Sequence, residues 1–247
     1  MQRAVLFDLD DTLLGNAMST FLPAYFGAIA RWVGDLVAPD LLIGALLQGT
    51  AAMGFNDGNG PTNEEAFAAV FYPMVGLERE TLQPVFESFY REAFPALRPL
   101  TTLRPEAFLL VRAAFAAGMQ VAVATNPVFP RSAIEQRLEW AGVGSGTFRF
   151  DVVTSYETSH ATKPHAAYYS EILARLDRLA GECLMVGDSW ELDIVPAIEA
   201  GMAAFWVRSP SAPGPPARAA LVGYGTLADL WRSVREANGR FPGNEQG

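Results

Sequence analysis

The sequence has a single cysteine and no long apolar run. Cys183 therefore has no partner for an intramolecular disulfide, and its place in the apolar run 183–186 predicts a buried thiol in the core. No stretch of about 18 apolar residues predicts a membrane span. The first residues lack the shape of a signal peptide, so we expect a cytoplasmic protein.

Basic residues are also scarce. Eighteen Lys and Arg face 27 Asp and Glu, which gives a formal net charge of −9 and a pI of about 4.8. A nucleic-acid-binding protein usually carries a basic face, so we expect no nucleic-acid partner. A small anionic substrate stays compatible with this charge, because a bound metal can invert the local field.

What the sequence has is apolar: 50% of its 247 residues are hydrophobic, enough for a sizeable core. Apolar runs that predict strands alternate with segments that predict helices, which is typical of a parallel sheet covered on both faces. We predict an α/β fold with a Rossmann-like, five-stranded parallel sheet. The expected strands are 3–9, 119–125, 150–154, 182–186 and 203–207, and the expected helices between and after them are 106–117, 131–140, 164–179, 191–200 and 226–237.

Residues 17–94 differ from this pattern because their apolar residues recur at helical spacing with no convincing strand. A loop is expected at 54–61, and Thr62 with Glu65 has the form of a capping box that opens the next helix. We therefore predict an α/β core of residues 1–16 and 100–236, an inserted all-helical cap of residues 17–99, and a frayed tail of residues 237–247.

An acidic cluster follows the first expected strand. Asp8, Asp10 and Asp11 stand within four residues, directly after the apolar run 4–7. Buried unpaired charge is costly, and a hard cation such as Mg²⁺ prefers oxygen ligands and would offset it. The alternative is a strand end that runs into a solvated acidic turn.

Polar residues follow three further expected strands. In open parallel sheets, ligands bind beyond the carboxyl ends of the strands, so these residues should meet there. One aspartate alone would be read as a helix cap or turn residue, but complementary groups at four strand ends are hard to explain in that way. The groups are Asp8 and Asp10, then Thr125 and Asn126, then Lys163, then Asp188 and Asp193.

Segments 8–13, 125–126, 163–164 and 187–193 resemble, in order, the four motifs of the haloacid dehalogenase-like (HAD) hydrolases. The resemblance covers residues 1–16 and 100–208. The inserted helical segment is similar in position and length to the helical, C1-type cap of the phosphatase branch of that superfamily.

The resemblance implies roles for the acidic residues. Asp8 would be the nucleophile that forms an aspartyl-phosphate, and Asp10 the general acid and base. Mg²⁺ would be held by the Asp8 side chain, the Asp10 backbone carbonyl and the Asp188 side chain. Asp193 would orient metal-bound waters or the lysine from behind these ligands.

It also implies roles for three other residues. The Thr125 hydroxyl and the Asn126 backbone N–H would hold the oxygens of the transferring phosphoryl group. Lys163 would steady the nucleophile and offset the charge that develops in the transition state.

The expected function is a Mg²⁺-dependent phosphatase acting on a small phosphorylated metabolite. Dehalogenases of this superfamily lack the second aspartate and need no metal, so Asp10 and Asp188 favour phosphoryl transfer. A phosphomutase, a metal-independent haloacid dehalogenase and a non-catalytic protein that binds a phosphorylated ligand or a protein partner are the alternatives. The sequence leaves the choice between monomer and homodimer open.

Polar residues of the inserted segment are weaker candidates. Asn16 at the hinge and Asn56, Asp57 or Asn59 in the loop could contact substrate, but the only motivation is their polarity within an apolar block. The alternative for the loop is simple solvation. We expect Asp11 to be a bystander and both histidines, His160 and His165, to be structural or to face solvent.

Overall fold

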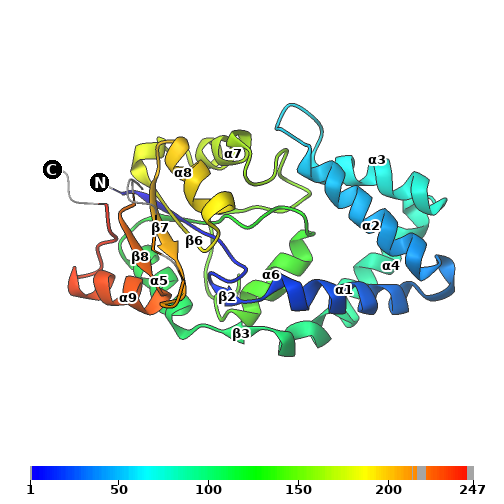
Figure 1. The fold of residues 1–247 in the computed structure, drawn as a ribbon, viewed down its shortest axis with the longest axis horizontal. Helices are drawn as coiled ribbons and strands as arrows, with labels where there is room; N and C mark the ends of the chain where they lie inside the picture. Colours follow the sequence, from blue (N-terminus) through cyan, green and yellow to red (C-terminus); the bar gives the residue numbers. More distant parts are fainter. Residues whose placement is uncertain (1, 213, 216–220, 244–247) are drawn as a thin grey trace.

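A six-stranded parallel sheet lies at the centre of the computed structural model, which describes residues 2–212, 214–215 and 221–243 (Figure 1). This confirms the predicted α/β class. In spatial order the strands are β5 (Val152–Val153), β4 (Gln120–Val123), β1 (Ala4–Phe7), β6 (Cys183–Gly187), β7 (Ala203–Val207) and β8 (Gly223–Gly225).

The predicted number of five strands was one too few. The sixth strand, β8, pairs in parallel with β7, with Phe205 opposite Gly223. Its sequence is Gly-Tyr-Gly, and glycine is depleted in strands, so propensity gave no reason to expect it. A Cβ atom on Gly223 would lie 2.9 Å from the Phe205 ring, so this close approach requires glycine.

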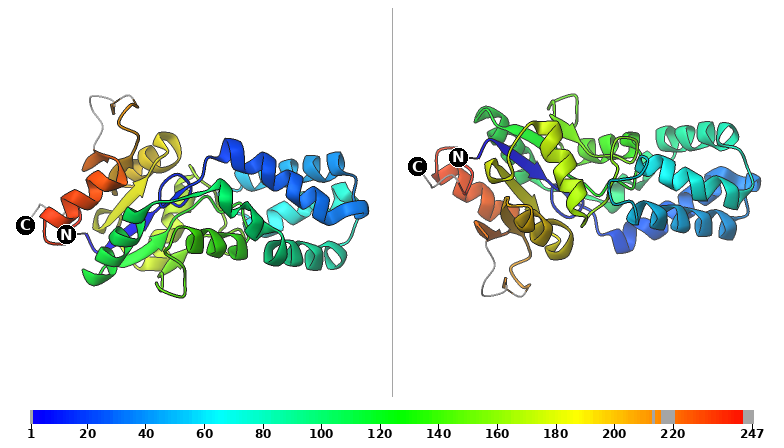
Figure 2. Two further views of the ribbon diagram at one scale, coloured as in Figure 1. Left: turned by 90° about the horizontal axis from the view of Figure 1, so that it is seen from below. Right: turned by 90° about the horizontal axis from the view of Figure 1, so that it is seen from above.

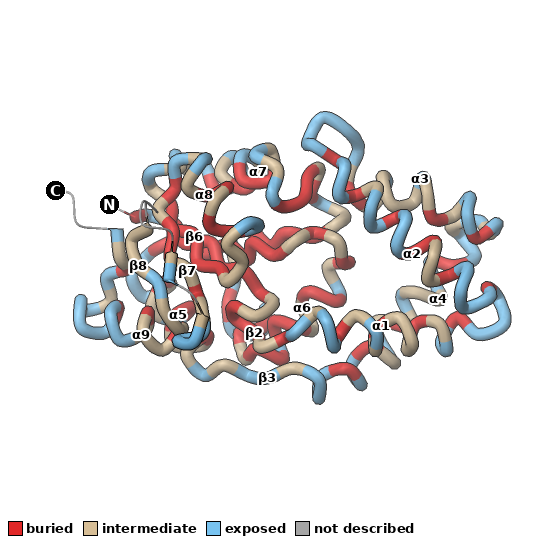
Figure 3. Tube along the Cα trace, viewed as in Figure 1, coloured by how far each residue is buried: buried red, intermediate tan, exposed pale blue. Residues whose placement is uncertain are grey.

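Both faces of the sheet are buried, which explains the nearly continuous apolar runs of its strands (Figure 3). Along β1, Val5 and Phe7 join one apolar cluster while Ala4 and Leu6 join another on the opposite face. The first cluster includes α5 (Pro105–Ala116), α6 (Arg131–Trp140) and α9 (Leu227–Glu236), and the second includes α7 (Ala166–Leu176) and α8 (Val195–Glu199).

The predicted helical insertion lies at the end of the molecule away from β8 and both termini (Figures 1 and 2). The capping box of Thr62 and Glu65 is confirmed at the start of its third helix. Whether core and cap divide at the predicted boundaries stays a prediction. The helices of the insertion are α1 (Met18–Val33), α2 (Pro39–Gly54), α3 (Asn63–Val75) and α4 (Arg79–Glu92), with a single 3₁₀ turn at Gly34–Leu36 and a longer 3₁₀ helix at Phe94–Leu100. Outside it, two further short helical turns cover Ala180–Glu182 and Trp190–Ile194.

The chain enters and leaves this helical segment through two paired strands, β2 (Leu14–Gly15) and β3 (Thr102–Leu103), which are antiparallel. A further connection is made by Asn63, which is fully buried. Its backbone N–H donates to Ser159 O at 2.8 Å, and its side-chain amide donates to Ala161 O at 3.1 Å. The helices are thus hydrogen-bonded to the core loop that leads to Lys163.

Part of the tail that we predicted to be frayed packs on the core. Phe241 is 1% exposed and packs edge-on against Phe7 of β1, with 6.4 Å between ring centroids. Residues 244–247 lie outside the described residues. Across the described part of the chain, no helix combines the length and the apolar character needed to cross a bilayer.

Candidate active site

The carboxyl ends of the three central strands place the predicted residues side by side. Phe7 of β1 pairs with Val123 of β4 on one side and with Val186 of β6 on the other. Asp8, Thr125 and Asp188 follow these strands within two residues, so they meet at the same edge of the sheet. This is the arrangement expected for a ligand site in an open parallel sheet.

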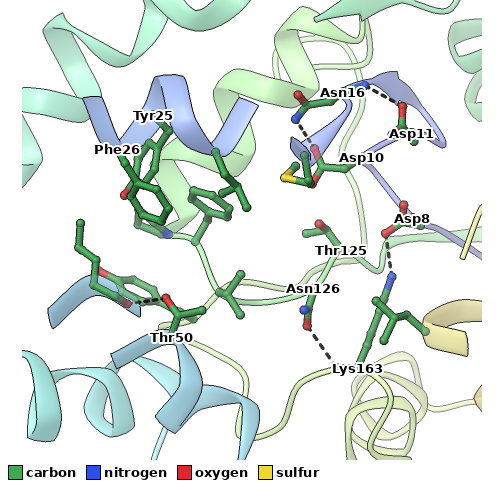
Figure 4. Close-up of a pocket in the computed structure, with 18 of the residues that line it drawn as sticks. Asp8, Asp10, Asp11, Asn16, Tyr25, Phe26, Thr50, Thr125, Asn126 and Lys163 are labelled. Atoms are coloured by element: carbon green, nitrogen blue, oxygen red, sulfur yellow. Dashed lines mark hydrogen bonds and ion pairs between the residues drawn. The ribbon is translucent and has the colours of Figure 1, made fainter. Parts of the chain in front are cut away.

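Lys163 lies at the centre of this edge and is the only lysine in the sequence. Its Nζ donates to Asp8 Oδ1 at 2.7 Å and to Asp193 Oδ1 at 2.5 Å, and all three side chains are less than 10% exposed (Figure 4). Burial by itself would lower the pKa of the lysine, but the Asp193 and Asp8 carboxylates hold that pKa well above its ordinary value. The ammonium is therefore charged and fixed between two carboxylates.

One lysine does not balance the three carboxylates around it. Oxygen atoms of Asp8, Asp188 and Asp193 lie within 4.8 Å of one another. Burial raises the pKa of Asp8 well above its ordinary value, and burial and the Asp193 carboxylate raise that of Asp188 to about 7. The cluster therefore gains from a further cation, and its all-oxygen donor set suits a hard divalent metal.

The hydrogen bonds separate two of these acids from the third. Asp193 uses both oxygens, since Oδ1 accepts from Lys163 and Oδ2 accepts from the backbone N–H of Ser189 at 3.0 Å. Within the described residues, Oδ2 of Asp8 and Oδ2 of Asp188 accept no hydrogen bond, and Asp188 Oδ1 accepts only from the Thr12 hydroxyl at 3.3 Å. Asp8 and Asp188 are thus available to a metal, and Asp193 supports Lys163 from behind.

The Asp10 carboxylate is bound by an arginine that sequence reasoning missed. Arg137 Nη1 donates to Asp10 Oδ2 at 2.7 Å and to Oδ1 at 2.9 Å, and Asn16 Nδ2 donates to Oδ1 at 2.7 Å. Arg137 is fully buried, its guanidinium lies 4.5 Å over the Phe129 ring, and its Nη2 has no partner within the described residues. A signal existed, because Arg137 stands next to Leu138 and four residues after Ala133 on the buried face of α6.

The loop after β4 is positioned by a buried network. The backbone carbonyl of Thr125 accepts hydrogen bonds from the Thr154 hydroxyl at 2.7 Å and from the Tyr168 hydroxyl at 2.9 Å. The Asn126 side-chain oxygen accepts from the backbone N–H of Lys163 at 3.2 Å. These contacts hold Thr125 and Asn126 against the loop that contains Lys163, and the Thr125 hydroxyl lies at the cavity (Figure 4).

Asp11 and Asn16 both line the cavity, and the other remaining candidates are structural. Asp11 also caps a turn, since its Oδ1 accepts from the backbone N–H of Asn16 at 3.0 Å. His160 Nδ1 lies 3.3 Å from Glu171 Oε1, and His165 Nε2 lies 2.9 Å from Gly54 O. The thiol of Cys183 belongs to a fully buried residue, as predicted.

Asn56, which we expected to contact substrate, does not line the cavity. Its side-chain amide donates to Pro61 O at 2.8 Å and to Asn63 Oδ1 at 2.9 Å. These bonds close the loop between α2 and α3 on itself. The polarity of the residue therefore serves the loop, and the expectation for Asn56 is corrected.

A cavity of about 530 Å³ extends from the carboxylates to the helical segment. Its core end is lined by Asp8, Asp10, Thr125, Asn126, Lys163, Asp188 and Asp193, together with Ser189. Its other end is formed by side chains of α1, α2, α3 and α4, of which Figure 4 labels Tyr25, Phe26 and Thr50. The carboxylates and the lysine therefore lie at one end of a chamber that is partly open to solvent.

Comparison with known proteins agrees with this geometry. The family model for haloacid dehalogenase-like hydrolases matches residues 2–201. The chain belongs to this family. It is accordingly a hydrolase by family.

Solved structures of low sequence identity share the fold. A HAD phosphatase from Thermococcus onnurineus is 22% identical, with a TM-score of 0.58 over 98% of this chain and all of that one. A 2-haloacid dehalogenase from Pseudomonas syringae is 23% identical, with a TM-score of 0.66 over 96% of this chain and all of that one. A predicted phosphoglycolate phosphatase from Haemophilus somnus is 20% identical, with a TM-score of 0.55 over 94% and 98%. No curated protein matched.

Proposed function

We propose that this HAD-like hydrolase is a Mg²⁺-dependent phosphatase that cleaves phosphate monoesters through an aspartyl-phosphate on Asp8. The observation that carries the proposal is the set of Asp8, Asp188 and Asp193 gathered around Lys163, with Asp10 beside them. A nucleophile of this kind needs a free oxygen, and Asp8 Oδ2 is such an atom.

In the first step Asp8 Oδ2 attacks phosphorus while the ester oxygen leaves. Lys163 offsets the added negative charge, and the Thr125 hydroxyl and the Asn126 backbone N–H receive phosphoryl oxygens. Mg²⁺ held by Asp8, Asp188 and the Asp10 carbonyl would neutralise charge on the phosphoryl oxygens. Asp193 keeps the lysine in place through its 2.5 Å contact with Nζ.

Asp10 would enter this step protonated, give its proton to the leaving oxygen and, as the resulting carboxylate, take a proton from the water that hydrolyses the aspartyl-phosphate. Arg137 and Asn16 fix its carboxylate beside the cavity. Both oxygens of Asp10 accept hydrogen bonds in this structure, so one of them has to turn toward the ester when substrate enters.

The phosphomutase alternative is less well supported by the cavity, because its substrate carries a second phosphate. The only cationic side chain among the residues that line the cavity is Lys163, which is already paired with two aspartates. A second anionic group would thus find no cation in the chamber, whereas a single phosphoryl group fits at its core end.

An assay with an aryl phosphate tests the proposal. We expect hydrolysis that requires Mg²⁺, stops with chelator and is absent in Asp8→Asn. Full activity of Asp8→Asn, or hydrolysis indifferent to chelator, would contradict the mechanism. Halide release from a haloacid in chelator would instead support the dehalogenase, and binding without any turnover would support the non-catalytic alternative.

A further inference from the structure

The end of the cavity opposite Asp8 is built almost wholly from apolar and aromatic side chains. They come from all four helices of the insertion and from the segments that precede α6 and α7, and Leu192 of the turn Trp190–Ile194 adds an apolar side chain beside Asp193. Charged residues that line the cavity lie only at its core end. The apolar and aromatic lining residues are Met18, Leu22, Tyr25, Phe26, Ile29, Leu46, Leu47, Phe67, Phe86, Tyr90, Val128, Phe129, Pro130, Tyr156 and Leu192.

The polar atoms on the helical wall of the chamber already have partners. The hydroxyls of Tyr25 and Tyr90 bond to each other at 2.8 Å, and the Thr50 hydroxyl donates to Leu46 O of its own helix at 2.8 Å. These three hydroxyls are the only side-chain polar groups that α1 to α4 contribute to the lining. A sugar or nucleoside entering here would lose more hydrogen bonds to water than the two remaining donors, one O–H of the tyrosine pair and the Tyr156 hydroxyl, could replace.

We propose that the substrate is the phosphate monoester of an apolar alcohol, with its phosphate at Asp8 and its alkyl or aryl body between α1, α2, α3 and α4. The proposal rests on the phosphatase function and adds the class of leaving alcohol. A chamber of about 530 Å³ lies within the range of pockets that enclose whole small ligands. Transfer of the alkyl or aryl body from water to this wall supplies the selectivity.

The test compares kcat/KM across ethyl, butyl, hexyl and octyl phosphate with Mg²⁺. We expect a rise of about fourfold for each added methylene until the chamber is full. Hexyl phosphate should exceed glucose 6-phosphate, which has the same number of carbons, by about 100-fold or more. Naphthyl phosphate, measured alongside, distinguishes an aromatic from an aliphatic preference.

A matched pair of variants locates the effect. Leu47 and Leu41 are both exposed leucines of α2, but only Leu47 lines the cavity. Leu47→Asn should lower kcat/KM for octyl phosphate by about fivefold and lower that for ethyl phosphate much less, because a hydrated amide then replaces an apolar contact with the far end of the alkyl group. Leu41→Asn should change neither. Equal loss on both substrates in Leu47→Asn would overturn the proposed position of the chain.

Binding of the non-hydrolysable alkylphosphonates separates the two proposals. Phosphatase activity with no dependence on chain length, or a preference for glucose 6-phosphate, would overturn the apolar substrate and leave the phosphatase standing. Phosphonate affinity that rises with chain length, without turnover of any ester, would overturn the phosphatase and keep the apolar ligand. Affinity independent of chain length would overturn the apolar ligand whatever the activity.

Discussion

The two ends of the cavity are opposite in chemistry although one chamber joins them. At the core end, carboxylates and one lysine crowd together at strand ends, with the pKa of Asp8 and Asp188 raised by burial. At the helical end, the wall is aromatic and aliphatic and its few hydroxyls are paired. Under the two proposals, the core end carries the reaction, and this difference teaches that selectivity would reside at the helical end.

The largest effect should come from the nucleophile. Asp8→Asn removes the attacking oxygen, so phosphatase activity should fall by about 10⁴-fold or more. The neighbouring Asp11→Asn is the matched control, because Asp11 caps a turn, and it should keep activity within a few-fold. Circular dichroism would check that both variants fold. Substantial activity in Asp8→Asn would show that chemistry does not occur at this carboxylate.

Metal binding should depend next on Asp188. Asp188→Asn should weaken Mg²⁺ binding, measured by calorimetry, by about 100-fold, because one of two available carboxylates is lost. In the wild type, affinity should fall as the pH drops from 8 to 5.5, since the Asp188 carboxyl, with a pKa of about 7, takes up a proton that excludes the metal.

The same raised pKa has a consequence for the metal-free protein. The folded state holds a proton on Asp188 that the unfolded chain releases above its ordinary pKa of 3.8, so stability should decrease as the pH rises from there to about 7. Binding of Mg²⁺ should restore the stability of the folded protein above pH 7. Thermal unfolding with and without chelator measures this, and a pH-independent effect of Mg²⁺ would contradict a role for Asp188.

A smaller loss should follow when Asp10 loses its support. Arg137→Met should lower kcat for an alkyl phosphate by about 10²-fold, but much less for p-nitrophenyl phosphate, whose leaving group needs no proton. The variant should also cost about 3 kcal/mol of unfolding free energy, because Asp10 is left without its buried partner. Asn16→Ala should likewise lower kcat for the alkyl phosphate more than kcat for p-nitrophenyl phosphate, because it removes the hydrogen bond from Asn16 to Asp10. Equal losses on both substrates would mean that Arg137 serves folding alone.

The smallest effect is expected at the helical wall. Tyr25→Phe breaks the hydroxyl pair with Tyr90, and the unpartnered hydroxyl should cost about 1 kcal/mol of unfolding free energy. Hydrolysis of alkyl phosphates should stay within about twofold. A large loss of kcat/KM in Tyr25→Phe would show that this hydroxyl binds substrate, and the contrast between the two ends would then be weaker.

Local patterns were enough for most of the fold. The alternation of apolar runs with helical periodicity gave the parallel sheet and the helical insertion, and the box of Thr62 and Glu65 gave a helix start. Strand β8 was not predicted, because pairing with β7, and not its own Gly-rich sequence, makes it a strand. The burial of Phe241 was not predicted, because it depends on contact with Phe7, more than two hundred residues away in the sequence.

The chemistry at the core end was set by the sequence, because strand ends of a parallel sheet must meet and their polar residues can be listed in order. The rest needed tertiary structure. Only the fold brings Arg137 of α6 to Asp10, separates Asn56 from the cavity and satisfies the Tyr25 hydroxyl before substrate arrives. Such contacts join segments with no fixed spacing, so packing alone decides which polar groups stay free and what the chamber can hold.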